Sequence, residues 1–193
     1  MSCRSMGSVR SLRSGLIGKD LRASSVKKLL LATEIGPGDW IQIHESAWKT
    51  GVGRSAIEEA KRARKAGSIS AGRIFRDNAT HRYLILQIIP FASPGDAISA
   101  VPKLPGLIVP NPNTDVQLVS EKQLEVAEIP QLTDGIAIEQ TTRGPRGQSS
   151  IRFIIAAVNS AAIFVSGSSM GEIWDWSEVL QVWRNQVSKI ENN

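Results

Sequence analysis

The stretch IRFIIAAV at residues 151–158, followed by Asn159-Ser160 and then AAIFVS at residues 161–166, decides the fold of this chain. Asn tolerates a positive φ and Ser can hydrogen-bond its own backbone, so these two residues predict a tight turn between two strands. Both strands carry apolar side chains in consecutive positions, which is typical of strands that are covered on both faces. The stretch therefore predicts a mostly buried β-hairpin, for which the rest of the chain must supply the cover.

A helix from about Trp176 to Ile190 is predicted to provide part of that cover. Asp175 stands at the N-cap position, and Glu178, three residues later, completes a capping box. Apolar side chains then recur at helical spacing, at Trp176, Val179, Leu180, Trp183, Val187 and Ile190. We interpret this stripe, its two tryptophans included, as a core face rather than a ligand box, because large aromatics dominate core energetics. The stretch 167–171 between hairpin and helix is interpreted as a flexible Gly/Ser link.

The remaining patterns predict further strands at 40–45, 68–76, 82–91, 116–119 and 135–142, and helices at 26–33, at 55–66 and from Ser93 onward. A strand pair followed by a helix occurs twice, at 68–101 and at 135–190. Two such units predict an α+β fold, in which an antiparallel β-sheet has its flanking helices on one face and the C-terminal amphipathic helix packs on the sheet.

Composition predicts one α+β domain at residues 26–193, preceded by a disordered basic tail at residues 1–25. The net charge is +5, yet residues 1–28 alone carry +6, so the remainder is close to neutral. Cys3 is the single cysteine and excludes an internal disulfide, and no apolar run approaches a membrane span. We expect a cytoplasmic protein as the chain is written, and an envelope-associated one if its start is mis-assigned.

The segment Gly167-Ser168-Ser169-Met170-Gly171 matches the G-x-S-x-G pattern of a hydrolase nucleophile. In hydrolases of that fold the histidine base follows the serine, whereas His44 and His81, the two histidines of this chain, both precede it. The gap between the predicted strand and helix is also longer than one sharp turn. A serine hydrolase that uses Ser169 is therefore kept only as the second alternative function.

No cofactor, metal or catalytic residue is predicted. The segment Thr50–Ser55 is similar to the end of a phosphate-binding loop, but Trp48 occupies the position of its first glycine and Arg54 that of its lysine. The two histidines lie 37 residues apart, and with one remote cysteine they do not have the spacing of a zinc site.

The predicted helix at 54–66 carries a cluster of basic side chains opposite a thin apolar stripe. Our candidate binding residues there are Arg54, Lys61, Arg62 and Lys65. Our default interpretation of the cluster is a solvated face with internal ion pairs to Glu58 and Glu59, and an acid-binding face is the sharper alternative. The first alternative function is therefore anion or nucleic-acid binding through the basic N-terminal tail and this helix, with binding that falls steeply as salt is added.

Short motifs in a fixed order carry a resemblance to a known group of proteins. The motifs are Gly38-Asp39-Trp40, Arg73-Ile74-Phe75, Phe91-Ala92-Ser93, Asp96-Ala97, Phe164-Val165-Ser166-Gly167 and Asp175-Trp176. Between about Lys28 and Ile190 the chain resembles uncharacterised actinobacterial proteins that are similar in layout to Mog1/PsbP-like sensor and lipoprotein domains. The resemblance implies an antiparallel α+β fold with a non-catalytic role, and it transfers no catalytic residues. As written, the chain departs from many of these proteins by lacking an export signal and a lipid-modified cysteine.

These observations lead to one functional expectation. The chain is predicted to be a single-domain binding or interaction protein that catalyses no reaction. Its partner is expected to be a protein, or a small ligand in the groove between the sheet and the helices. The identity of the partner and the oligomeric state stay open. Spacing also leaves open whether Trp40 and Trp48 are core or contact residues.

Overall fold

The computed structural model describes residues 35, 38–47, 71–91, 93–105, 115–124, 132, 134–171 and 173–192. The predicted basic tail and the predicted helices at 26–33 and 55–66 lie outside these residues. The described strands are β1 (Trp40–Ala47), β2 (Ala71–Asp77), β3 (Tyr83–Pro90), β4 (Gln117–Leu124), β5 (Gly135–Gly144), β6 (Gly147–Val158) and β7 (Ala161–Ser169). The described helices are α3 (Pro94–Ala100), the short 3₁₀-helix η1 (Val101–Lys103) and α4 (Trp176–Glu191).

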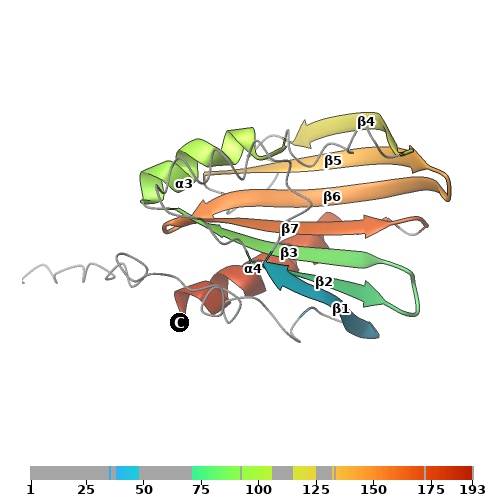
Figure 1. Ribbon diagram of the computed structural model, residues 1–193, viewed down its shortest axis with the longest axis horizontal. Coiled ribbons are helices and arrows are strands. Elements are labelled where there is room, and N and C mark those ends of the chain that lie inside the picture. The colour runs from blue at the N-terminus through green and yellow to red at the C-terminus, as the bar shows by residue number, and fades with distance from the viewer. Residues whose placement is uncertain are drawn as a thin grey trace, which may run out of the picture.

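All seven strands form one sheet in the order β1-β2-β3-β7-β6-β5-β4, and every neighbouring pair is antiparallel (Figure 1). The hairpin β6–β7 lies in the interior of the sheet and turns at Asn159, which has a φ of 53°. The predicted α+β fold, with an antiparallel sheet and a C-terminal helix packed on it, is confirmed.

The two helices pack on opposite faces of the sheet, so the prediction that both lie on one face is wrong. Alternate residues of β6 show this, because Ile154 belongs to the cluster under α4 whereas Phe153 and Ile155 belong to the cluster with α3 and η1. The physical reason is in the sequence of the hairpin itself. Strands with apolar side chains on both faces expose one apolar face unless each face is covered.

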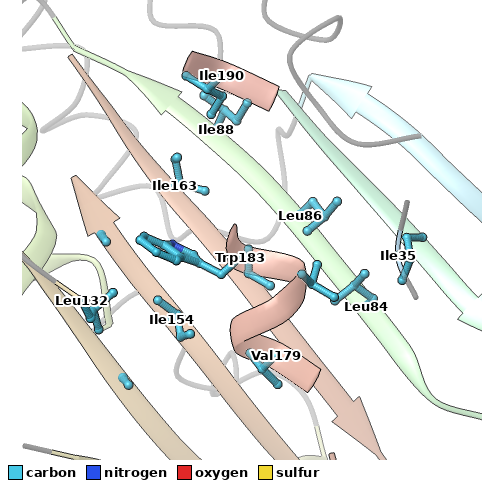
Figure 2. Packing of buried hydrophobic residues seen from close by; sticks show 14 of the residues in the cluster. Ile35, Leu84, Leu86, Ile88, Leu132, Ile154, Ile163, Val179, Trp183 and Ile190 are labelled. Carbon is cyan, nitrogen blue, oxygen red and sulfur yellow. The ribbon is translucent and has the colours of Figure 1, made fainter. Parts of the chain in front are cut away.

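The face under α4, which we call the α4 face, holds the larger core. Val179, Trp183 and Ile190 reach down from the helix onto the sheet, where they meet residues such as Leu84 and Ile163 (Figure 2). The predicted capping box is present, since the Asp175 side chain accepts from Glu178 N and the Glu178 side chain accepts from Asp175 N at 3.0 Å; Asp175 also accepts from Ser177 N at 2.9 Å.

The opposite face, which we call the α3 face, holds a second cluster. Its buried members are Ile89, Phe91, Ala97, Val101, Leu104, Ile138, Phe153, Ile155, Ala162 and Phe164. Ser93 caps α3 by accepting from Asp96 N at 3.2 Å, and Pro94 stands in the first turn, where its missing N–H costs nothing.

Both edge strands carry a register irregularity. The extra residues are Ile43 in β1 and Val119 in β4, and both side chains are exposed. Bulges and charges on an edge strand discourage pairing with another chain. In β4 the charges are supplied by Glu121 and Lys122, which point to opposite faces.

Candidate ligand-binding surface

Within the described structure, helix cover on the α3 face is confined to one end of the sheet. Helix α3 follows β3 directly and packs on β6 and β7 near the β6–β7 turn (Figure 1). The β2–β3 and β5–β6 turns lie at the other end of the sheet, away from α3 (Figure 1). At that end neither described helix covers the α3 face.

One line of side chains crosses all seven strands at this end. Strand register places in it, from β1 to β4, Ile41, Arg76, Tyr83, Ser168, Ile151, Gln140 and Glu121. Residues directly opposite each other on neighbouring strands share a face. Six strand intervals of about 4.8 Å make the line roughly 29 Å long. We call this line, together with Leu118, Ser149 and Met170 beside it, the open surface.

The apolar members of the open surface are partly exposed. Met170 is 47% exposed, Leu118 is 40% exposed and Ile41 is 37% exposed, while Tyr83 and Ile151 are half-buried. A methyl group built on Gly147 would lie 3.9 Å from the Met170 side chain, which places Met170 beside the β5–β6 turn. Apolar side chains gathered in the open on a sheet face are a frequent mark of a binding site.

Two polar members of the line have hydrogen-bonding atoms that find no partner. Gln140 is fully buried; its Nε2 donates to Glu121 Oε2 at 2.7 Å, and its Oε1 has no partner. At the other end, Arg76 Nη2 donates to Asn78 Oδ1 at 3.0 Å, and its buried Nε has no partner. A buried polar atom without a hydrogen bond costs about 1–3 kcal/mol, so each such atom calls for an explanation.

Charge on the open surface is confined to its two ends. Arg76 stands on β2 and Glu121 on the edge strand β4, with only uncharged side chains between them in the line. Five strand intervals of about 4.8 Å separate these two strands, or roughly 24 Å. The surface can therefore hold an elongated, mostly apolar molecule whose ends differ in polarity.

Two carboxyl groups of the described structure have displaced pKa values. The pKa of Asp77 is lowered, first by a hydrogen bond from Thr80 and then by those from the Ala79 and Asp39 backbone. The pKa of Asp175 is lowered mainly by its hydrogen bonds with Ser177, as expected for an N-cap. Turn closure and helix capping explain both shifts, without any acid–base chemistry.

The first three residues of the G-x-S-x-G segment, Gly167 to Ser169, belong to the sheet, so the interpretation of this part as a flexible link is wrong. Strand β7 continues through Ser169, and Gly167 pairs with Arg152. Ser169 is buried, and its Oγ accepts from Gly171 N at 3.0 Å. Among the described hydrogen bonds, none joins this hydroxyl to a histidine.

The glycine at the start of this segment makes room for Trp174. A Cβ on Gly167 would lie 2.6 Å from the Trp174 ring, which the alanine side chain could not tolerate without displacement. The Trp174 indole N–H donates to Ser168 O at 3.2 Å, and Arg82 lies 4.6 Å from the ring centroid. The pattern therefore arises from packing between β7 and the segment that leads into α4.

Trp40, left open between core and contact, is half-buried and packs against the core under α4. Its ring centroid lies 5.4 Å from that of Trp174, and Arg82 lies over both rings. Arg82 also forms an ion pair with Glu178, its Nη1 lying 2.9 Å from Oε1 and 3.0 Å from Oε2. These contacts fasten β1 and the start of β3 to the first turn of α4. Trp48 lies outside the described residues.

The sequence-predicted binding residues Arg54, Lys61, Arg62 and Lys65 also lie outside the described residues, so anion binding through them stays a prediction. In the described part of the chain, no three His, Cys, Asp or Glu side chains gather as a metal site would need. None of the described helices is long and apolar enough to cross a membrane.

Sequence reasoning missed the open surface. Gln140, which follows Ile136 and Ile138 at alternate positions of one strand, was a signal that could have been noticed, because a buried glutamine needs partners. Register across the sheet, however, brings Gln140 into one line with Tyr83 and Arg76. These residues are far apart in the sequence, and no local pattern pairs them.

Comparison with known proteins places the fold. No protein-family model matches the chain, and no curated protein does. The extracellular domain of PknH from Mycobacterium tuberculosis is similar in structure, with a TM-score of 0.51 at 14% identity, over 86% of this chain and 94% of that one. A putative uncharacterized protein from Mycobacterium smegmatis, the Rv0999 ortholog, aligns with a TM-score of 0.48 at 9% identity, over 86% of this chain and 96% of that one.

The sequence resemblance to actinobacterial proteins is thus supported at the level of fold, since the PknH domain has the same architecture. Neither of these structures is a Mog1 or PsbP protein by its description, so the finer likeness stays a prediction.

Proposed function

We propose that this chain is a non-catalytic binding domain and that its ligand lies on the open surface. The observation that carries the proposal is the line from Ile41 to Glu121, in which partly exposed apolar side chains alternate with polar ones. Two polar residues of the same line, Arg76 and Gln140, each keep one buried atom without a partner, and Gln140 also hydrogen-bonds the exposed Glu121. Ligand sites are mostly apolar, with a few polar groups that fix orientation.

The size of the open surface favours a small amphipathic ligand over a globular protein. About 29 Å of sheet width and two rows of side chains, together roughly 13 Å deep, give an area of roughly 400 Å². A stable protein–protein interface needs about 800 Å² from each partner. The open surface alone is therefore too small for such an interface, but it is of the size that one small, elongated molecule covers.

The proposal includes a location outside the cytoplasm. The similar PknH domain is extracellular by its description, and this setting supports an envelope-side location here. Cell fractionation with intact-mass measurement of the native protein tests it. Recovery from the envelope or medium is expected, whereas recovery of a chain that begins at Met1 from the cytosol would contradict it.

Binding is tested with the uncharged dye Nile red on the whole protein. Met170→Glu places a charge on the open surface and is expected to reduce dye affinity at least several-fold. Ile173→Glu is the matched control: Ile173 is 54% exposed but lies outside the open surface, so this change should leave dye binding intact. Equal effects of the two substitutions, or no dye binding by the wild type, would refute the proposed site.

A further inference from the structure

The pair Gln140–Glu121 has no evident stabilising role. Gln140 is fully buried between two apolar neighbours of β5 on the same face, Ile138 and Thr142 with its methyl group. A leucine there would fill similar space without leaving an acceptor unpaired. The hydrogen bond to the exposed Glu121 satisfies the buried Gln140 Nε2 and leaves Oε1 without a partner. The glutamine therefore leaves one acceptor of the core without a hydrogen bond, and its amide N–H holds one surface carboxylate in place.

The orientation of the Gln140 amide follows from its partner. A carboxylate only accepts hydrogen bonds, so the amide must turn Nε2 towards Glu121 Oε2, 2.7 Å away, and Oε1 away from it. Among the described residues, no other side chain hydrogen-bonds the Glu121 carboxylate. Gln140 Oε1 is buried, whereas Glu121 is exposed, so this end of the open surface offers the Glu121 carboxylate as the acceptor for a ligand.

Glu121 is the charged member of the line at this end, while the exposed Arg143 and Arg146 stand near the β5–β6 turn rather than in the line. Lys122, the next residue, points to the α4 face, where Glu139 stands opposite it and is ion-paired with Arg152. Arg76 lies about five strand intervals, or roughly 24 Å, away. That distance is well beyond the screening length of about 8 Å at physiological salt. Arg76 is thus too far away to compete with a positive group for Glu121.

We propose that Glu121, positioned by the buried Gln140, binds a protonated primary amine of the ligand, while the apolar part of the same ligand lies over Ile151 and Tyr83. This inference rests on the proposed function, since it names the ligand class of the same surface. Glu121 makes the contact, and Gln140 is a positioning residue. Charge-assisted hydrogen bonds from N–H groups to a carboxylate are among the strong ones, and they require a donor that a quaternary ammonium lacks.

The test compares three probes of equal chain length on the full protein: decylammonium, decyltrimethylammonium and decanol, each below its aggregation limit. Titration calorimetry should show decylammonium binding about tenfold more tightly than the other two, which corresponds to one charge-assisted hydrogen bond. The protein has a net charge of +5 and therefore repels cations in general. Non-specific electrostatic attraction would thus not explain a preference for decylammonium.

Three variants separate the head-group contact from the surface itself. Glu121→Gln should remove the preference for decylammonium and leave decanol binding unchanged, and Gln140→Leu should weaken the preference while keeping decanol binding. Glu139→Gln makes the same charge change on the α4 face and should have no effect. If all three probes bind alike and only Met170→Glu weakens them, the amine proposal is overturned while the binding surface stands. If no probe binds, the proposed function fails with it.

Discussion

Replacing Gly167 with alanine would insert a methyl group into the space that the Trp174 ring occupies. The added Cβ would lie 2.6 Å from Cδ2 and 2.8 Å from both Cγ and Cε2 of the indole. No real Cβ sits so close to a carbon atom, so the ring or the strand must move. Trp174 is only 3% exposed and is held by Trp40, Arg82 and the Ser168 carbonyl, so it has no free direction in which to yield.

The magnitude follows from what the displaced ring would lose. Adding a methyl group to a well-packed site costs about 1–3 kcal/mol. Weakening the aromatic pair with Trp40 adds up to about 1 kcal/mol, and weakening the cation–π contact with Arg82 adds a similar amount. Removing a buried tryptophan side chain entirely costs about 3–5 kcal/mol, which sets the upper limit. We expect a loss of about 2–3 kcal/mol, or roughly 4–12 °C in Tm for a chain of this size.

Urea unfolding, followed by far-ultraviolet circular dichroism, measures this loss. Gly171→Ala is the matched control in the same five-residue segment, because no heavy atom lies within 4 Å of its added Cβ. That control should change the free energy of unfolding by less than about 0.5 kcal/mol. In a Trp174→Leu background, Gly167→Ala should cost much less than in the wild type. If Gly167→Ala is as neutral as Gly171→Ala, the packing explanation of the glycine is wrong.

Three further outcomes are expected. Arg82→Lys should lower the free energy of unfolding by about 1–2 kcal/mol in urea titrations, because a single ammonium cannot contact Glu178, donate to Thr80 and lie over the Trp174 ring at once; an unchanged midpoint would contradict this. The pKa of Asp77 is lowered below its ordinary 3.8, chiefly by the hydrogen bond from Thr80, so ionised Asp77 stabilises the fold above that pH. This stabilisation is lost as the pH falls through the lower pKa of the folded state. Asp77→Asn should therefore flatten the fall of stability in acid, and an identical fall in the variant would refute this. A serine-directed fluorophosphonate should label wild type and Ser169→Ala equally or not at all, whereas loss of labelling only in the variant would revive the hydrolase alternative.

Local patterns in the sequence predicted much of the scaffold. The Asn159-Ser160 turn, the capping box at Asp175 and the strand–strand–helix order each depend on residues within a few positions of one another. Such signals were sufficient for the α+β class and the C-terminal helix. The same reasoning failed at Gly167, where a glycine in a Gly/Ser stretch indicated a link. In the structure the Trp174 ring lies where a side chain at position 167 would be.

What the sequence by itself determined is the set of elements, because hydrophobic period and caps are local properties of the chain. The tertiary structure alone decided which helix covers which face and which residues share the open surface. Placement of α3 and α4 on opposite faces follows from the apolar side chains on both faces of β6 and β7 only once both strands are in the sheet interior. Glu121, Ile151 and Tyr83 come into one line through register across the sheet, which is a relation between distant segments and leaves no trace in the spacing of any one of them.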